Sequence, residues 1–149
     1  MERIFSPWRM EYVRGGGSSS GGRCIFCVGE EERTDPERLV LGFYPNSLAI
    51  LNRYPYNNGH VLLAPRRHVA DLPALSEEER AELFSLLSLG TKAIGEEYAP
   101  EGFNIGMNSG EVAGQTVMHC HVHLIPRRRG DVPSPRGGVR HVIPGKGEY

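Results

Sequence analysis

The stretch VMHCHVHLI, residues 117–125, is the segment that decides the expected fold of this chain. His119, His121 and His123 alternate with apolar residues, which is the period of a β-strand that has one buried face. On such a strand the three imidazoles share one face, about 7 Å apart. Cys120 and its apolar neighbours share the other face, which we expect to pack on a helix.

These positions hold three of the six histidines of the chain. Exposed strand positions are usually filled by Thr, Lys, Glu or Arg, so an ordinary polar surface explains the cluster poorly. Two chemical interpretations remain. The three imidazoles either chelate a metal, as in a zinc-hydroxide enzyme, or act directly on a phosphate group.

Outward from this stretch, the sequence predicts one long helix and several strands. Ser76 followed by Glu79 forms a capping box, and apolar residues then recur at helical spacing until Pro100. Apolar stretches bounded by Pro, Asn and Gly predict strands, and the short links between the first three favour antiparallel pairing. The expected strands are residues 38–44, 47–52, 59–64, 103–108 and 116–125. We therefore expect an α+β fold, with an antiparallel sheet of about five strands and one helix.

The length of 149 residues suits one domain with additional terminal segments. Residues 15–22, GGGSSSGG, are a flexible linker by composition. We expect residues 1–23 to be an N-terminal segment that contains this linker, and residues 24–130 to be the main domain. Residues 131–149 are expected to be a tail that docks on the domain or on a dimer partner.

Composition argues against several classes of protein. The 17 basic and 18 acidic side chains give a net charge of −1, unlike a general nucleic-acid coat protein. No apolar run approaches the roughly 20 residues of a membrane-spanning helix. The first residues, MERIFSPWRM, lack the apolar stretch of a secretory signal. We expect a cytoplasmic protein that binds neither nucleic acid nor membrane.

Cys24 and Cys27 form a C-x-x-C pair in a chain with three cysteines, which are too few for a disulfide framework. In a cytosolic chain this spacing indicates metal or redox chemistry. On its own it is a weak signal, and the alternative is a pair of reduced, buried thiols.

Two segments resemble the histidine triad (HIT) superfamily of nucleotide hydrolases and transferases. Residues 114–127, GQTVMHCHVHLIPR, satisfy its signature His-φ-His-φ-His-φ-φ, in which φ is apolar. Residues 52–65, NRYPYNNGHVLLAP, are similar to its first conserved block. The triad segment looks most like the diadenosine-polyphosphate, or fragile-histidine-triad-like, branch. This resemblance implies a HIT-like fold that pairs as a homodimer, and a nucleotide substrate.

The resemblance also implies roles for individual residues. His121 would be the nucleophile, attacking the α-phosphorus to form a covalent nucleotidyl-histidine, with its tautomer fixed by a main-chain carbonyl near His119. His123 would donate to phosphate oxygens, His119 would complete the catalytic triad, and His60 would support it. The implied substrate-binding residues are Leu51, Asn52, Asn108, Gln115, Thr116 and His123. In simpler terms, Asn52 could cap a strand end and Asn108 could be a turn residue.

A metal site is implied as well. Cys24, Cys27, His68 and His119 match the zinc ligands of many bacterial HIT proteins and of galactose-1-phosphate uridylyltransferases. We expect structural zinc there and no organic cofactor. Because a zinc-bound His119 cannot protonate a leaving group, we expect phosphoanhydride bonds to be cleaved in preference to phosphoramidate bonds.

The leading hypothesis is cleavage of dinucleoside polyphosphates, such as diadenosine tetraphosphate, through a nucleotidyl-His121 intermediate. A diadenosine tetraphosphate phosphorylase (ATP adenylyltransferase) would use inorganic phosphate in place of water. An adenosine phosphoramidate hydrolase and a nucleotide-binding sensor also remain open. So does a metal-dependent hydrolase built on the three histidines.

Overall fold

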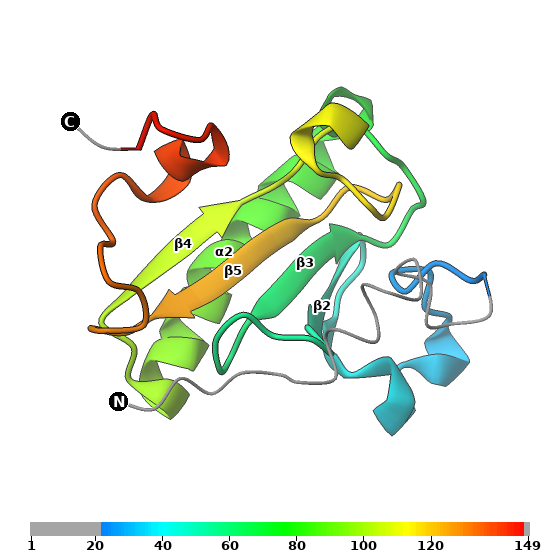
Figure 1. Cartoon of the computed structure of the whole chain (residues 1–149). Helices are drawn as coiled ribbons and strands as arrows, with labels where there is room; N and C mark the ends of the chain where they lie inside the picture. Colours follow the sequence, from blue (N-terminus) through cyan, green and yellow to red (C-terminus); the bar gives the residue numbers. More distant parts are fainter. Residues whose placement is uncertain (1–21, 148–149) are drawn as a thin grey trace.

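The computed structural model describes residues 22–147, so nearly all of the expected N-terminal segment, residues 1–23, lies outside the described residues. Five antiparallel strands form one sheet in the order β1-β2-β3-β5-β4. The strands are β1 (Val40–Phe43), β2 (Ser47–Leu51), β3 (Val61–Pro65), β4 (Gly102–Gly106) and β5 (Val122–Arg127). One long helix, α2 (Glu77–Tyr98), crosses a face of the sheet (Figure 1). The expected α+β architecture is confirmed, and pairing as a dimer stays a prediction.

Helix α2 begins and ends where its sequence signals predict. Ser76 Oγ accepts a hydrogen bond from the Glu79 N–H at 3.2 Å, and Glu79 Oε2 accepts one from the Ser76 N–H at 2.8 Å. These two bonds are the reciprocal pair of a capping box. At the other end Ala99 has a left-handed backbone with φ of 44°, directly before Pro100, which cannot continue a helix.

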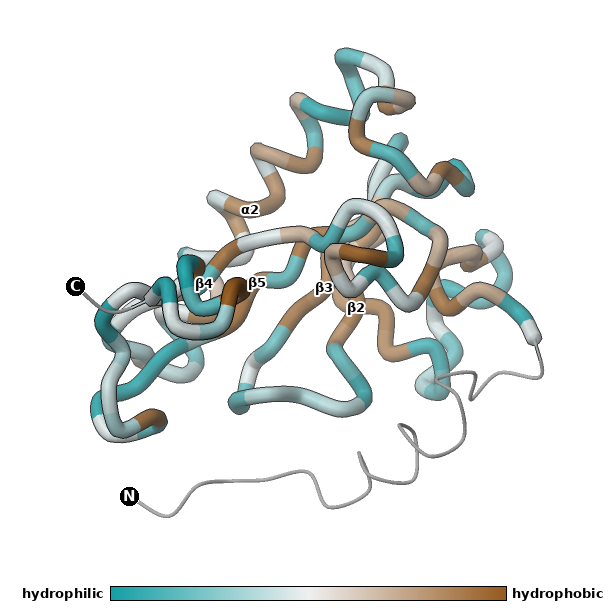
Figure 2. The backbone as a smooth tube through the Cα atoms, turned by 45° about the horizontal axis from the view of Figure 1, so that its top comes forward, coloured by the Kyte–Doolittle hydropathy of each residue, from teal (hydrophilic) through white to brown (hydrophobic). Residues whose placement is uncertain are grey.

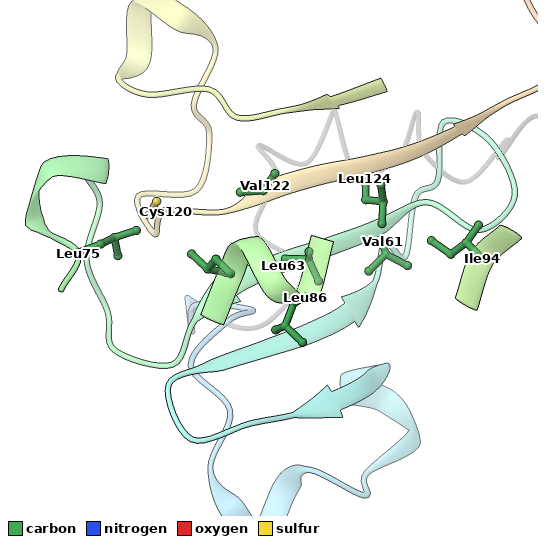
Figure 3. Close-up of a cluster of buried hydrophobic side chains, with 9 residues drawn as sticks. Val61, Leu63, Leu75, Leu86, Ile94, Cys120, Val122 and Leu124 are labelled. Atoms are coloured by element: carbon green, nitrogen blue, oxygen red, sulfur yellow. The ribbon is translucent and has the colours of Figure 1, made fainter. Parts of the chain in front are cut away.

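Apolar side chains cover both faces of the sheet. Between sheet and helix, Cys120 and Leu124 pack with Leu86 and Ile94 of α2 (Figure 3). The opposite face carries a second cluster, consisting of Phe26, Leu48, Ile50, Leu62 and Ala64. All five residues of β3 are consequently buried. Figure 2 shows this distribution, with hydrophobic residues along the central strands and hydrophilic ones in the connecting loops.

The triad segment departs from the expected strand. The prediction of a strand over residues 116–125 is confirmed for 122–125 and wrong for 116–121, because β5 begins only at Val122, and of the three histidines only His123 lies in it. Strand β5 pairs with β3 no further back than Val122. Before that point the Cys120 N–H donates to the carbonyl of Val69, at 2.6 Å, rather than to a strand. The side chains nevertheless alternate as expected. Cys120, Val122 and Leu124 join the cluster under α2, whereas Phe26 on the other side contacts the rings of His119 and His121, and the ring of His121 lies 5.1 Å from that of His123.

The C-terminal tail lies beside β4 (Figure 1) and includes a short 3₁₀ turn, Gly138–Val142. This turn contacts β4, but the side chains of Val139, Val142 and Ile143 are 61%, 73% and 57% exposed. Docking of the tail on a second copy stays a prediction. Within the described residues, no helix combines the length and apolarity needed to span a membrane.

Candidate active site

A cleft of about 260 Å³ opens on the sheet face away from α2, beside the second apolar cluster. Six of the residues singled out in the sequence line it, namely Leu51, Asn52, Asn108, Thr116, His121 and His123. Apolar walls with a few convergent polar groups are typical of a small-molecule site. His60, His119 and Gln115 are buried and do not line this cleft.

His121 is held with one nitrogen fixed and the other available. Its Nδ1 lies 2.7 Å from the carbonyl oxygen of His119. Because a carbonyl only accepts, Nδ1 carries the proton, and the lone pair of the neutral ring is on Nε2. This is the main-chain contact that the sequence analysis expected. Phe26 stacks on the ring at 4.8 Å between centroids, and burial lowers the pKa of His121, which favours its neutral form.

Hydrogen bonds from Tyr56 through His60 fix the tautomer of His123. The Tyr56 N–H donates to His60 Nδ1 at 3.2 Å, so a neutral His60 carries its proton on Nε2. That nitrogen lies 3.0 Å from His123 Nδ1, which must then accept. A neutral His123 therefore presents an Nε2–H donor, the group needed to bind a phosphate oxygen. The expected supporting contact of His60 is present in this form.

His119 faces away from the cleft, and its side chain is fully buried. Its Nε2–H donates to the carbonyl of Pro65 at 2.8 Å, which leaves Nδ1 as an unprotonated acceptor. Burial lowers the pKa of His119 to about 4, so the ring is neutral at pH 7. Neither nitrogen is therefore directed at a leaving group in the cleft.

The Nδ1 atom of His119 belongs to a cluster of four possible metal ligands. It lies 3.4 Å from Cys24 Sγ, 3.8 Å from Cys27 Sγ and 3.1 Å from His68 Nδ1. All four ligand atoms lie within 4.8 Å of one another. A tetrahedral ion with nitrogen ligands at about 2.1 Å and sulfur ligands at about 2.3 Å has distances of about 3.4–3.8 Å between its ligand atoms. Cys24, Cys27, His68 and His119 can therefore hold a tetrahedral metal ion, and the hydrogen bond to Pro65 orients His119 as such a ligand requires.

A metal site built on the three triad histidines is not formed. Within residues 22–147 the cluster of two cysteines and two histidines is the only gathering of possible ligands, and of the triad it includes His119 alone. The Nδ1 of His121 is bonded to a carbonyl and that of His123 to His60. The three imidazoles therefore do not converge on one point.

The amide side chains expected to bind substrate are used in different ways. Asn52 accepts from the Tyr54 N–H at 3.0 Å and lies 3.2 Å from His60 Nδ1, yet it still lines the cleft. Gln115 accepts from the Gly110 N–H at 2.8 Å and donates to main-chain carbonyls, so its side chain holds its own loop together. The structure therefore brings Asn52 to the cleft but not the Gln115 side chain.

Several lining residues were not expected from the sequence. Arg53 and Glu37 both line the cleft, and the Arg53 guanidinium donates to the Glu37 carbonyl at 2.5 Å. Further lining residues that the sequence analysis missed include Ile25, Phe26, Arg38, Tyr54 and Tyr56. Two signals could have found some of them. Phe26 stands between the two cysteine ligands, and Arg53, Tyr54 and Tyr56 lie in the block of residues 52–65 that also contains His60.

Comparison with known proteins agrees with this geometry. Residues 33–130 match the model of the HIT domain. The chain belongs to the HIT family. The "AP-4-A phosphorylase" of Mycobacterium tuberculosis is 35% identical over 137 residues, which are 88% of this chain and 70% of that protein. "Adenosine 5'-monophosphoramidase hnt1" of Schizosaccharomyces pombe is 38% identical over 104 residues, 70% of this chain and 74% of that protein.

A solved HIT structure, the "ZN-bound histidine triad family protein" of Mycobacterium smegmatis, superposes on this HIT chain with a TM-score of 0.59. It is 28% identical and covers 85% of this chain and 78% of its own. The HIT-like fold expected from the sequence is therefore confirmed.

Proposed function

We propose that this chain cleaves dinucleoside polyphosphates at the α-phosphate through a covalent nucleotidyl-His121 intermediate. One observation carries the proposal. The Nδ1–H of His121 is bonded to the His119 carbonyl, so the Nε2 lone pair belongs to a ring that lines the cleft. A neutral, oriented imidazole is the form of histidine that attacks phosphorus.

The reaction then follows from the tautomers. The Nε2 lone pair of His121 forms a bond to the α-phosphorus while the bond from phosphorus to the leaving-group oxygen breaks. His123 donates its Nε2–H to a non-bridging oxygen and stabilises the charge that develops there. The oxygen of the acceptor, water or inorganic phosphate, next attacks the same phosphorus, and the N–P bond breaks to release His121.

The leaving group sets the range of substrates. A nucleotide polyphosphate leaves as a stabilised anion, whereas an amine must be protonated as it leaves. His119 is directed at Pro65 and the cysteines, so it does not supply that proton. This arrangement favours phosphoanhydride bonds over phosphoramidate bonds. The mycobacterial relative is named a phosphorylase and matches most of the chain, which supports inorganic phosphate as the acceptor.

We also propose that the Cys24, Cys27, His68 and His119 cluster binds zinc in a structural role. Its two thiol and two imidazole ligands suit zinc, and the mycobacterial HIT neighbour described above is zinc-bound. Bound zinc would tie the cysteine segment to the triad segment. The proposed reaction steps use the imidazoles of His121 and His123, and the metal takes no part in them.

A quench experiment tests the function. The full chain is mixed with diadenosine tetraphosphate, quenched in alkaline denaturant because the P–N bond of a nucleotidyl-histidine is labile in acid, digested at alkaline pH and analysed for adenylate mass on the peptide that contains His121. We expect the adduct in the wild type and in His141→Ala, which changes an exposed histidine outside the cleft, and none in His121→Ala. ADP formed only when phosphate is added identifies a phosphorylase, whereas AMP without phosphate identifies a hydrolase. An unmodified wild-type peptide under turnover contradicts the proposed intermediate. If His121→Ala loses turnover but keeps the binding of a partner protein, the nucleotide-binding sensor is favoured instead.

A further inference from the structure

His68 is an exposed side chain in an otherwise enclosed cluster. Its Nδ1 lies 3.3 Å from Cys27 Sγ and 3.1 Å from His119 Nδ1. The ring packs edge-on against that of His119, at 4.9 Å between centroids, but its exposed side has no such support, so its position also depends on the backbone that carries it. What fixes the loop of residues 65–69 therefore also fixes this ligand.

The same loop holds the peptide between His119 and Cys120. The Cys120 N–H donates to the carbonyl of Val69 at 2.6 Å, while the carbonyl of that peptide accepts from His121 at 2.7 Å. One peptide unit is thus bonded on one side to the loop and on the other to the imidazole that lines the cleft. A shift of the loop would move the metal ligand and the peptide together.

Arg67, directly before His68, attaches the loop to the start of α2. Its guanidinium makes two parallel bonds to the Glu79 carboxylate, at 3.0 and 2.8 Å, and a third to the carbonyl of Ala74 at 2.8 Å. Only 7% of the Glu79 side chain is exposed, although 53% of Arg67 is. A bidentate pair on a buried carboxylate fixes both distance and orientation, unlike a surface ion pair.

We propose that Glu79 and Arg67 are positioning residues for the metal site, holding the loop of residues 65–69 so that His68 meets the other three ligands. This inference rests on the proposed metal site. Glu79 already completes the capping box of α2 with one carboxylate oxygen. The same oxygen and its neighbour bind Arg67, so the first turn of the helix serves as the anchor of the loop.

The geometry provides variants that separate positioning from helix stability. Glu79→Gln keeps a residue that a capping box accepts at this position but loses the charged, two-pronged bond to Arg67. Arg67→Lys keeps the charge but loses the planar guanidinium that makes two parallel bonds to Glu79. Ser76→Ala is the matched control, because it removes the other half of the capping box and leaves the pair between Arg67 and Glu79 intact.

The experiment measures the Zn²⁺ dissociation constant of each full-length chain by competition with a chromophoric chelator, at a temperature where all are folded by circular dichroism. Co²⁺ spectra report the tetrahedral geometry. Partners of metal ligands typically contribute about 10–100-fold to affinity, and we expect about tenfold weaker binding in Glu79→Gln and in Arg67→Lys. The double variant should be no weaker than either single variant, and Ser76→Ala should stay within about twofold of wild type despite its lower Tm.

Two results would overturn the proposal. If Glu79→Gln binds Zn²⁺ as tightly as wild type, the pair does not position the loop. If Ser76→Ala weakens binding as much as Glu79→Gln, the effect comes from helix stability alone. A wild-type chain that binds no Zn²⁺ would instead refute the metal site, and this inference with it, while the adenylate test on His121 would still stand.

Discussion

Replacing Phe26 by leucine tests whether the triad is held by packing as well as by hydrogen bonds. The Phe26 side chain is 1% exposed, and its ring lies 4.8 Å from that of His121 and 5.3 Å from that of His119. His121 is also held by its bond to the His119 carbonyl and by a contact with the ring of His123, at 5.1 Å between centroids. Phe26→Leu keeps an apolar residue at the site but removes the flat face against which the nucleophile lies.

The expected magnitudes follow from these contacts. Truncation of a buried Phe to Ala costs about 3–5 kcal/mol, and the smaller change to Leu should cost about 1–2 kcal/mol. A chain with a stability of about 5–15 kcal/mol therefore stays folded. An aromatic pair contributes about 0.5–1.5 kcal/mol beyond its buried area. If the stack on His121 serves to orient it, formation of the nucleotidyl adduct should slow by about 2- to 10-fold.

Leu48→Val is the matched control. Leu48 is also 1% exposed and belongs to the same apolar cluster, but it does not line the cleft. Loss of one buried methylene and the resulting void should cost about 1–2 kcal/mol. A single-turnover reaction quenched in alkaline denaturant, at saturating diadenosine tetraphosphate, measures the rate of adduct formation, and thermal unfolding measures stability. Equal rates in the two variants, at similar loss of stability, would show that Phe26 contributes only to the core.

Three further predictions concern stability, metal and substrate. The carboxylate of Asp131 makes a bidentate pair with Arg127, which holds the Asp131 pKa well below its usual range; Asp131→Asn should cost about 1–2 kcal/mol at pH 7. The pKa of an unfolded Asp is about 4, and the native pKa of Asp131 is lower. The difference in stability between the two chains should therefore shrink as the pH falls below about 4, as urea titrations of both chains would show. When Zn²⁺ is added to the metal-free chain at a free concentration about a hundredfold above its dissociation constant, it should raise the stability by about 2.7 kcal/mol, which is roughly 10 °C in Tm. The chelated chain should still cleave dinucleoside tetraphosphate below its Tm, and a loss of cleavage without unfolding would contradict a structural metal. Adenosine phosphoramidate should be cleaved at least about a hundredfold more slowly than diadenosine tetraphosphate, because His119 supplies no proton; comparable rates by chromatography would contradict its sequestered position.

The sequence predicted those features that local patterns encode. The capping box and Pro100 located both ends of α2, and apolar stretches located four of the five strands to within two residues at each end. The four possible metal ligands, which are 95 residues apart at the extremes, came from the resemblance to the HIT family and are gathered in the structure. Each of these features depends on a motif that stands in the sequence in full.

Features that depend on non-local partners were not predictable in this way. Period-two alternation extended the triad strand back to residue 116, but strand β3 ends at Pro65, and β5 pairs with it only from Val122. Alternation predicts which side chains are buried, but it does not predict the partners of the main-chain hydrogen bonds. The cleft residue Glu37 was missed for a similar reason, since it lies in no motif and reaches the cleft beside Arg53 of a different segment.

The apolar positions of the triad motif have a role in positioning as well as in burial. Cys120 packs under α2 with Leu75 and Leu83, and its N–H is bonded to Val69. Its side chain therefore sets the depth of the peptide whose carbonyl fixes His121. Because a well-packed core resists displacement, the packing of Cys120 between the sheet and α2 helps to fix the orientation of His121. The alternation of histidine with apolar residues thus links the reactive side of the segment to the buried cluster under α2.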